Sequence, residues 1–167
     1  AYLSARYDGF LPTAFERISY VGYAVPGVVL GLALVFFGSQ YATPIYQTLY
    51  LLVFAYVIRF LPQSVGSLRA SFLSVDPALP EAARTLGQTS AGAFRYVTLP
   101  LVAPGLFGGA ALVFLTTMKE LPATLLLRPS GFTTLVTHIW TAYESGYFGQ
   151  AAVPALVLLF VSGLSML

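Results

Sequence analysis

Long stretches of this chain contain no charged side chain, and this feature constrains the fold more than any other. Residues 18–38 and 101–118 are uncharged and largely apolar, and residues 45–61 are interrupted only by Arg59 near their end. A fourth apolar stretch covers residues 151–167. Because a helix needs about 20 apolar residues to cross a bilayer, the pattern predicts an all-α, multi-pass membrane protein, a helical bundle with about four transmembrane helices.

The composition agrees with lipid as the main solvent. Only 8% of the 167 residues are charged and 57% are hydrophobic, with a mean hydropathy of +0.81. A soluble domain carries about 25% charged residues, so this chain could not cover an ordinary soluble surface. It is also too apolar for disorder. A single lysine argues against nucleic-acid binding, and the lack of cysteine excludes disulfides, thiolate metal sites and cysteine nucleophiles.

The ends of the chain suggest a piece of a longer protein. It begins at Ala1 and ends at the apolar Leu167, so we expect it to be incomplete at both ends. No charged segment with a small-residue cleavage site precedes residues 18–38, so no signal peptide is expected.

The basic residues predict an orientation in the membrane. The segment before the first span, the long hydrophilic loop at 63–100 and the helix end just before it hold six of them: Arg6, Arg17, Arg59, Arg69, Arg84 and Arg95. The connection at 119–150 holds only Lys119 and Arg128. Since cytoplasmic loops carry the excess of Lys and Arg, the 63–100 loop is predicted to be cytoplasmic. Arg59 is expected to extend its guanidinium to that interface.

Two spans carry the small-residue spacing that permits close helix packing. Gly27 and Gly31 lie four residues apart in the first span, and Gly105 and Gly109 do so in the third. Pro26 and Pro104 are expected to kink or begin helices.

Residues 132–144 repeat apolar side chains at helical spacing, which predicts an amphipathic helix at the outer interface or against the bundle. Its polar face would carry His138, the only histidine, together with Thr134, Thr137, Thr141 and Glu144. One histidine cannot supply a multi-histidine metal site, and tyrosines near a bilayer edge usually anchor helices at headgroup depth. No metal ligand and no cofactor is therefore assigned.

The loop at 63–100 carries the most informative residues of the sequence. Pro80 suits the first turn of a helix, Glu81 lies near the positive end of its dipole, and alanines follow. Gly87 is placed to end that helix with a positive φ. A second helical stretch over residues 90–97 would lead into the third span. The fixed residues are Pro80, Glu81, Ala82, Ala83, Gly87, Leu99 and Pro100.

The spacing EAA-x3-G-x9-V-x-L-P, which runs from Glu81 to Pro100, resembles the signature of permease subunits of bacterial binding-protein-dependent ABC importers. The resemblance implies a MetI-like permease domain over residues 1–167, in the bacterial cytoplasmic (inner) membrane. In that family the loop forms a coupling helix that docks on a separate ATPase. The implied partners are an ABC ATPase dimer, an extracytoplasmic solute-binding protein and a second permease half or copy.

Two further segments, residues 16–27 and 119–129, look like the ferric-iron branch of these permeases, which often fuses two permease halves in one chain. The resemblance implies ferric iron as the substrate. Importers of polyamines, thiamine and inorganic anions share much of the scaffold and stay open as alternatives.

Lys119 and Glu120 follow directly on an uncharged span. Charges at membrane depth are expensive, so they suggest a pathway or gate. Alternatively, they mark the outer water interface.

The sequence favours a transport subunit over an enzyme. ATP hydrolysis needs a GxxxxGK(S/T) loop, and the only lysine follows Met118. A membrane-embedded enzyme would need a reactive pair within a span, and the spans at 18–38 and 101–118 contain no ionisable group except tyrosine phenols. A passive channel subunit would not need a docking loop.

Overall fold

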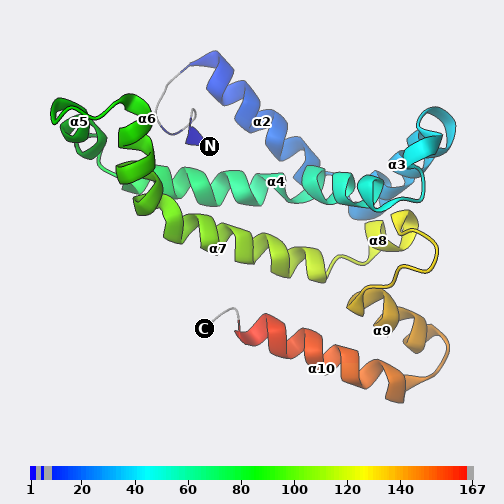
Figure 1. Cartoon of the computed structure of the whole chain (residues 1–167). Coiled ribbons are helices and arrows are strands. Elements are labelled where there is room, and N and C mark those ends of the chain that lie inside the picture. The colour runs from blue at the N-terminus through cyan, green and yellow to red at the C-terminus, as the bar shows by residue number, and fades with distance from the viewer. Residues whose placement is uncertain (3–4, 6–8, 165–167) are drawn as a thin grey trace. The chain divides into compact units, whose positions relative to one another are not determined.

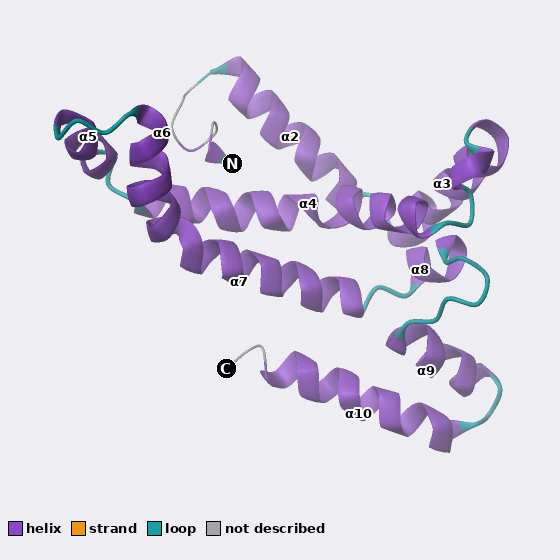
Figure 2. Ribbon diagram, viewed as in Figure 1, coloured by secondary structure: helices purple, strands orange, loops and turns teal. Residues whose placement is uncertain are grey.

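A computed structural model describes residues 1–2, 5 and 9–164, and every regular element in that part of the chain is helical (Figures 1 and 2). This confirms the all-α prediction. The elements are α2 (Phe10–Ala24), α3 (Gly27–Tyr41), the short 3-10 helix η1 (Thr43–Ile45), α4 (Leu49–Ser74), α5 (Ala78–Thr85), α6 (Ser90–Ala93), the π-helical turn η2 (Phe94–Thr98), α7 (Leu99–Met118), α8 (Pro122–Leu127), α9 (Leu135–Glu144) and α10 (Phe148–Leu164).

The predicted spans differ from the observed helices in number and extent. Within the described residues, two helices are long and apolar enough to cross a membrane, Leu49–Ser74 and Ser90–Met118, or three if the pair α2 and α3 counts as one broken span. The fourth predicted span corresponds to α10, which has 17 described residues. The described part of the chain thus holds two or three such helices and one shorter apolar helix, where the sequence predicted about four spans with the last one incomplete.

The first predicted span is not one helix, because the chain breaks at Pro26. Pro26 has φ −57° and ψ 139°, an extended conformation, and α3 begins at the next residue. The proline ring also disfavours a helical conformation at Val25. Pro26 thus directly precedes the start of a helix, close to one of the two roles predicted for it, whereas Pro104 lies inside α7.

The predicted hydrophilic loop is much shorter than residues 63–100. Helix α4 continues past Pro62 to Ser74, and a continuous helix begins again at Ser90. The polar residues of 63–74 are accommodated in a helix because hydroxyls such as that of Ser71 donate to backbone carbonyls of the preceding turn, here Ser67 O at 2.9 Å. The predicted helical stretch over 90–97 is confirmed.

The chain divides into two compact units, residues 1–21 with 61–113 and residues 22–60 with 114–167. In the first unit, α7 packs on the C-terminal part of α4 through its glycines. A Cβ added to Gly105 would overlap Ser71 Oγ, and one added to Gly109 would lie 2.9 Å from Ser67 Cβ. The close packing predicted from the four-residue glycine spacing is confirmed here.

In the second unit, the six-residue helix α8 lies against α3 (Figure 1). A Cβ added to Gly31 would lie 2.7 Å from Leu126 Cδ1 and 3.4 Å from Ala123 Cα, so this pair of helices also needs a small residue. The buried core beside them consists of Leu34, Leu51, Leu52, Ala55 and Leu127. Helices α9 and α10 pack together after a turn at Gly146, which has φ 76°.

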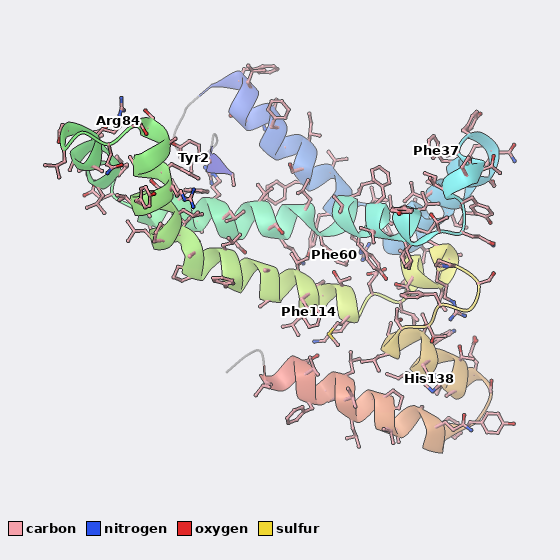
Figure 3. All side chains as sticks on the ribbon, in the orientation of Figure 1. Tyr2, Phe37, Phe60, Arg84, Phe114 and His138 are labelled. Atoms are coloured by element: carbon pink, nitrogen blue, oxygen red, sulfur yellow. The ribbon has the colours of Figure 1, made fainter. Side chains whose placement is uncertain are left out.

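The predicted amphipathic helix exists as α9, but its buried face differs from the prediction. Thr137, expected on the polar face, is fully buried, whereas Tyr143 is exposed. Burial of Thr137 is tolerated because its hydroxyl and that of Thr134 form a capping box at the start of the helix. His138 is exposed (Figure 3).

Candidate functional site

Helix α5 holds most of the residues expected to couple the protein to a partner. Asp76 Oδ1 accepts from Ala78 N at 2.9 Å at the start of the helix, Glu81 lies in its first turn and Arg84 in its last. Gly87 has φ 92°, and its N–H donates to Arg84 O at 3.1 Å. Gly87 therefore follows the helix in the left-handed conformation that its position predicted, and the helix itself begins at Ala78, two residues before Pro80.

Three apolar side chains of α5 and of the residue that follows it are exposed. Leu79 is 47% exposed and Leu86, which follows the last turn, is 86% exposed, and Ala82 between them is exposed as well. Positions 79, 82 and 86 share one face at helical spacing. We call these three residues the apolar stripe of α5. A stripe of this kind is normally buried against another element.

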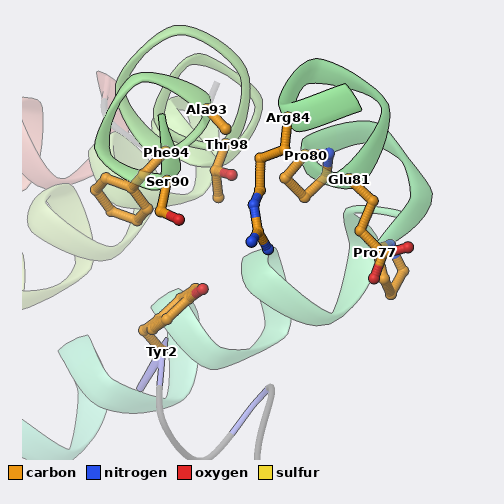
Figure 4. A pocket seen from close by; sticks show the side chains of 9 residues that line it. All are labelled: Tyr2, Pro77, Pro80, Glu81, Arg84, Ser90, Ala93, Phe94 and Thr98. Carbon is orange, nitrogen blue, oxygen red and sulfur yellow. The ribbon is translucent and has the colours of Figure 1, made fainter. Parts of the chain in front are cut away.

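The opposite side of α5 faces a hollow of about 400 Å³ (Figure 4). Arg84 extends its guanidinium into this hollow, whereas the Glu81 carboxylate lies beside Pro77. The hollow is lined by Tyr2, Pro77, Pro80, Glu81, Arg84, Ser90, Ala93, Phe94 and Thr98.

The structure brings only part of the predicted coupling set to this hollow. Pro80 and Glu81 line it, whereas Ala82, Ala83 and Gly87 do not. Leu99 and Pro100 are exposed at the start of α7, continuous with the helical turn before it.

A second polar site lies in the other unit and was not foreseen as a whole. Glu120, which is only 6% exposed, pairs with Arg59 of α4, with Nε to Oε2 at 3.0 Å. Arg59 Nη1 also donates to Val25 O at 3.2 Å. The expectation that Arg59 extends to the cytoplasmic interface is wrong, because its guanidinium is held by Glu120 and by the carbonyl at the Pro26 break.

The same site fixes the start of α8. Ala123 N donates to Glu120 Oε1 at 3.2 Å, and the Thr124 hydroxyl donates to Glu120 O at 2.5 Å. Tyr56 Oη lies 2.6 Å from Thr124 Oγ1. Tyr56 and Arg59 lie one turn apart on α4, so one face of this apolar helix is polar where it meets α8.

The two adjacent charges at 119 and 120 have different surroundings. Glu120 is buried, and Lys119 is exposed. Sequence reasoning treated them as a unit, and it missed Arg59 as the partner because the two residues lie on elements far apart in the chain. The polar residues at 56 and 59 within an apolar stretch were the available signal.

Among residues 1–2, 5 and 9–164, no three His, Cys, Asp or Glu side chains come close enough to hold a metal ion.

Comparison with known proteins gives a family. Residues 1–167 match the family described as binding-protein-dependent transport system inner membrane component. The chain is 37% identical over 161 residues to an Fe(3+)-transport system permease protein of Haemophilus influenzae, covering 96% of this chain and 32% of that protein.

Other relatives are named for other substrates. A permease of Salmonella typhimurium named for a 2-aminoethylphosphonate transport system is 27% identical over 152 residues, 91% of this chain and 57% of the relative. A permease of Haloferax volcanii named for a molybdenum ABC transporter is 35% identical over 127 residues, 75% of this chain and 46% of the relative. The chain thus spans between about a third and three fifths of the length of these relatives.

Proposed function

Because the chain belongs to the family of binding-protein-dependent transport system inner membrane components, we propose that it forms part of the membrane pathway of an ABC importer and couples to a separate ATPase through α5. The observation that carries the coupling role is the apolar stripe of α5. It is exposed in a segment rich in charged and polar residues, where an apolar face gains most from a protein partner.

The mechanism follows from the position of α5 in the chain between the two membrane-crossing helices. ATP binding would close the ATPase dimer and displace the docked helix. That displacement would shift the permease between inward-open and outward-open arrangements, which is alternating access. The chain would transmit the motion of the ATPase and line part of the pathway. It would catalyse no reaction itself, since the ATPase would hydrolyse ATP.

The proposed location is the bacterial inner membrane, with α5 on the cytoplasmic side. With α2 and α3 taken together as one crossing, the side of α5 holds five basic residues even without Arg59. They are Arg6, Arg17, Arg69, Arg84 and Arg95, against Lys119 and Arg128 on the other side. The positive-inside rule therefore gives the same orientation. An extracytoplasmic solute-binding protein and a second permease half or copy would complete the importer.

Ferric iron is the proposed substrate, supported by the Haemophilus relative and by the segments at 16–27 and 119–129. The relatives named for phosphonate and molybdenum transport favour a small anion as the second candidate. ATP-driven uptake of radiolabelled ferric iron, 2-aminoethylphosphonate and molybdate, each measured separately with the reconstituted importer, separates the two candidates. Uptake of either anion without uptake of iron would favour the second candidate.

Replacing Leu86 by aspartate should abolish co-purification of the ATPase with the permease and reduce ATP-driven uptake. The substitution places a charge in the middle of an interface that would otherwise bury an apolar side chain. Leu86 is 86% exposed in the permease alone, so the fold should be unaffected. Co-purification from membranes, with uptake measured in parallel, is the test.

The matched control is Thr85→Asp, which adds the same charge to an exposed neighbour outside the apolar stripe. It should retain most of the association. Equal association of wild type and Leu86→Asp, at equal expression, would show that the apolar stripe of α5 does not dock the ATPase.

A further inference from the structure

We infer that Arg59 and Glu120 are positioning residues that lock α8 onto α3 and α4, so that these three elements move as one body during transport. The inference rests on the proposed function for the existence of a transport cycle. Neither residue is assigned contact with the substrate. What they hold in place is α8, a segment of six residues that is too short to be stable as an isolated helix.

Two interactions attach α8 to α4. Glu120 bridges the Arg59 guanidinium and the N–H of Ala123 in the first turn of α8. The second is the hydrogen bond between Thr124, the next residue of α8, and Tyr56, one turn before Arg59 on α4, with 2.6 Å between the two oxygens. Both interactions join one face of α4 to the start of α8. A rotation or a shift of α8 along α4 would therefore break the ion pair and the hydrogen bond together.

The attachment extends to α3 through the break at Pro26. A break of this kind leaves carbonyls at the end of the preceding helix without helical partners. Arg59 donates to one of them, Val25 O. Gly27, at the start of α3, lies against the pair itself, since a Cβ there would be 2.7 Å from Glu120 Oε1 and 2.9 Å from Arg59 Nη1. The absence of a side chain at Gly27 is therefore what lets α3 approach the charges.

The free energy needed to separate Arg59 from Glu120 indicates that the ion pair stays formed throughout the transport cycle. Removing a charge from its partner in an apolar setting leaves a buried ion without compensation. Glu120 has no other cationic side chain among its described contacts. A gate that opened here would meet this cost at every turnover, so the moving surfaces are expected elsewhere.

An engineered disulfide between α3 and α8 tests this inference. The ideal Cβ of residue 31 lies 3.3 Å from Leu126 Cβ, close to the spacing of about 3.5–4.5 Å between the Cβ atoms of a disulfide. Leu126→Cys also removes the methyl group that a side chain at Gly31 would meet. These 167 residues contain no cysteine, so the parent full-length protein and the two single variants serve as background controls.

The full importer carrying Gly31→Cys and Leu126→Cys is reconstituted, and ATP-driven uptake is measured oxidised and reduced. We expect the oxidised form to keep uptake within about twofold of the reduced form, because the joined elements need not separate. Loss of uptake on oxidation that is restored by reduction would overturn the inference. Failure of the cysteines to oxidise would also overturn it, because it would contradict the packing of α8 on α3.

Variants that remove the charges of Arg59 and Glu120 show whether these residues position α8 or contact the substrate. Glu120→Gln should lower the maximal uptake rate about tenfold or more because it leaves Arg59 unpaired. The double variant Arg59→Gln with Glu120→Gln removes both charges and should recover most of that rate, with the KM for substrate unchanged in both variants. A double variant as inactive as the single one, or a raised KM, would contradict the positioning role. Absence of ATP-driven uptake in the wild type would instead contradict the proposed function.

Discussion

Replacing Glu120 by alanine is expected to destabilise the folded protein by about 3 kcal/mol, whereas the same replacement at the adjacent Lys119 should have almost no effect on stability. Alanine at 120 leaves the Arg59 charge without its partner and Ala123 N without its acceptor. The estimate is at the low end for a buried pair because Arg59 is 25% exposed and retains some access to solvent. Lys119 is exposed.

The measurement is thermal unfolding in a fixed detergent, with the two variants prepared side by side. A clearly lower midpoint for Glu120→Ala and an unchanged midpoint for Lys119→Ala are expected. Equal midpoints would contradict the ion pair as a source of stability.

The Lys119→Ala variant also tests the expectation that Lys119 serves the pathway. If Lys119 lies at the outer mouth of the pathway, Lys119→Ala should lower uptake, because it removes a charge that interacts with an entering solute. It should leave stability unchanged. Unchanged uptake at normal expression would place Lys119 at the outer water interface without a transport role.

Replacing Gly105 by alanine is the second change with a large expected effect. Its Cβ would overlap Ser71 Oγ and lie 2.7 Å from Ser71 Cβ, so α4 and α7 must move apart. Overpacking of this kind costs about 1–3 kcal/mol. Thermal unfolding and the yield of monodisperse protein should both fall.

Gly108→Ala is the matched control, since a Cβ at Gly108 meets nothing within 4 Å. Both changes add the same helix propensity, about 1 kcal/mol in favour of alanine, so their difference isolates packing. The double variant Gly105→Ala with Ser71→Gly should recover stability, because it removes Ser71 Oγ and Cβ, the two atoms closest to the new Cβ, while Ser71 Cα lies at 3.8 Å. Equal stability of the two single variants would show that Gly105 is not a packing residue.

Local features of this protein could be predicted from the sequence because their causes lie within a few residues. Gly87 ends α5 with a positive φ because a tight helix end favours glycine, and Gly105 with Gly109 forms a packing face because their spacing places them on one side of α7. The motif from Glu81 to Pro100 indicated the family, because all of its fixed residues lie in one short segment of the sequence.

The features that were missed depend on partners distant in the sequence. Arg59 looked like an interfacial residue because its partner Glu120 lies on another element. The helical extension over 63–74 looked like a loop because its polar residues suggested water, whereas Ser67 and Ser71 provide the small surface on which α7 packs. In α9, a side-chain pattern predicted the wrong buried face because Thr137 is satisfied by the capping box.

The most direct test of the central claim, that α5 docks a separate ATPase, is site-specific cross-linking from Leu86→Cys in the assembled importer. Tyr147→Cys is the matched control, because Tyr147 is also largely exposed, at 61%, and lies in the connection proposed to face the outside. With a short reagent that has a thiol-reactive group at one end and a photoreactive group at the other, Leu86→Cys is expected to give a product that contains the ATPase, and Tyr147→Cys is expected to give none. A product with the ATPase from Tyr147→Cys and none from Leu86→Cys would contradict the account.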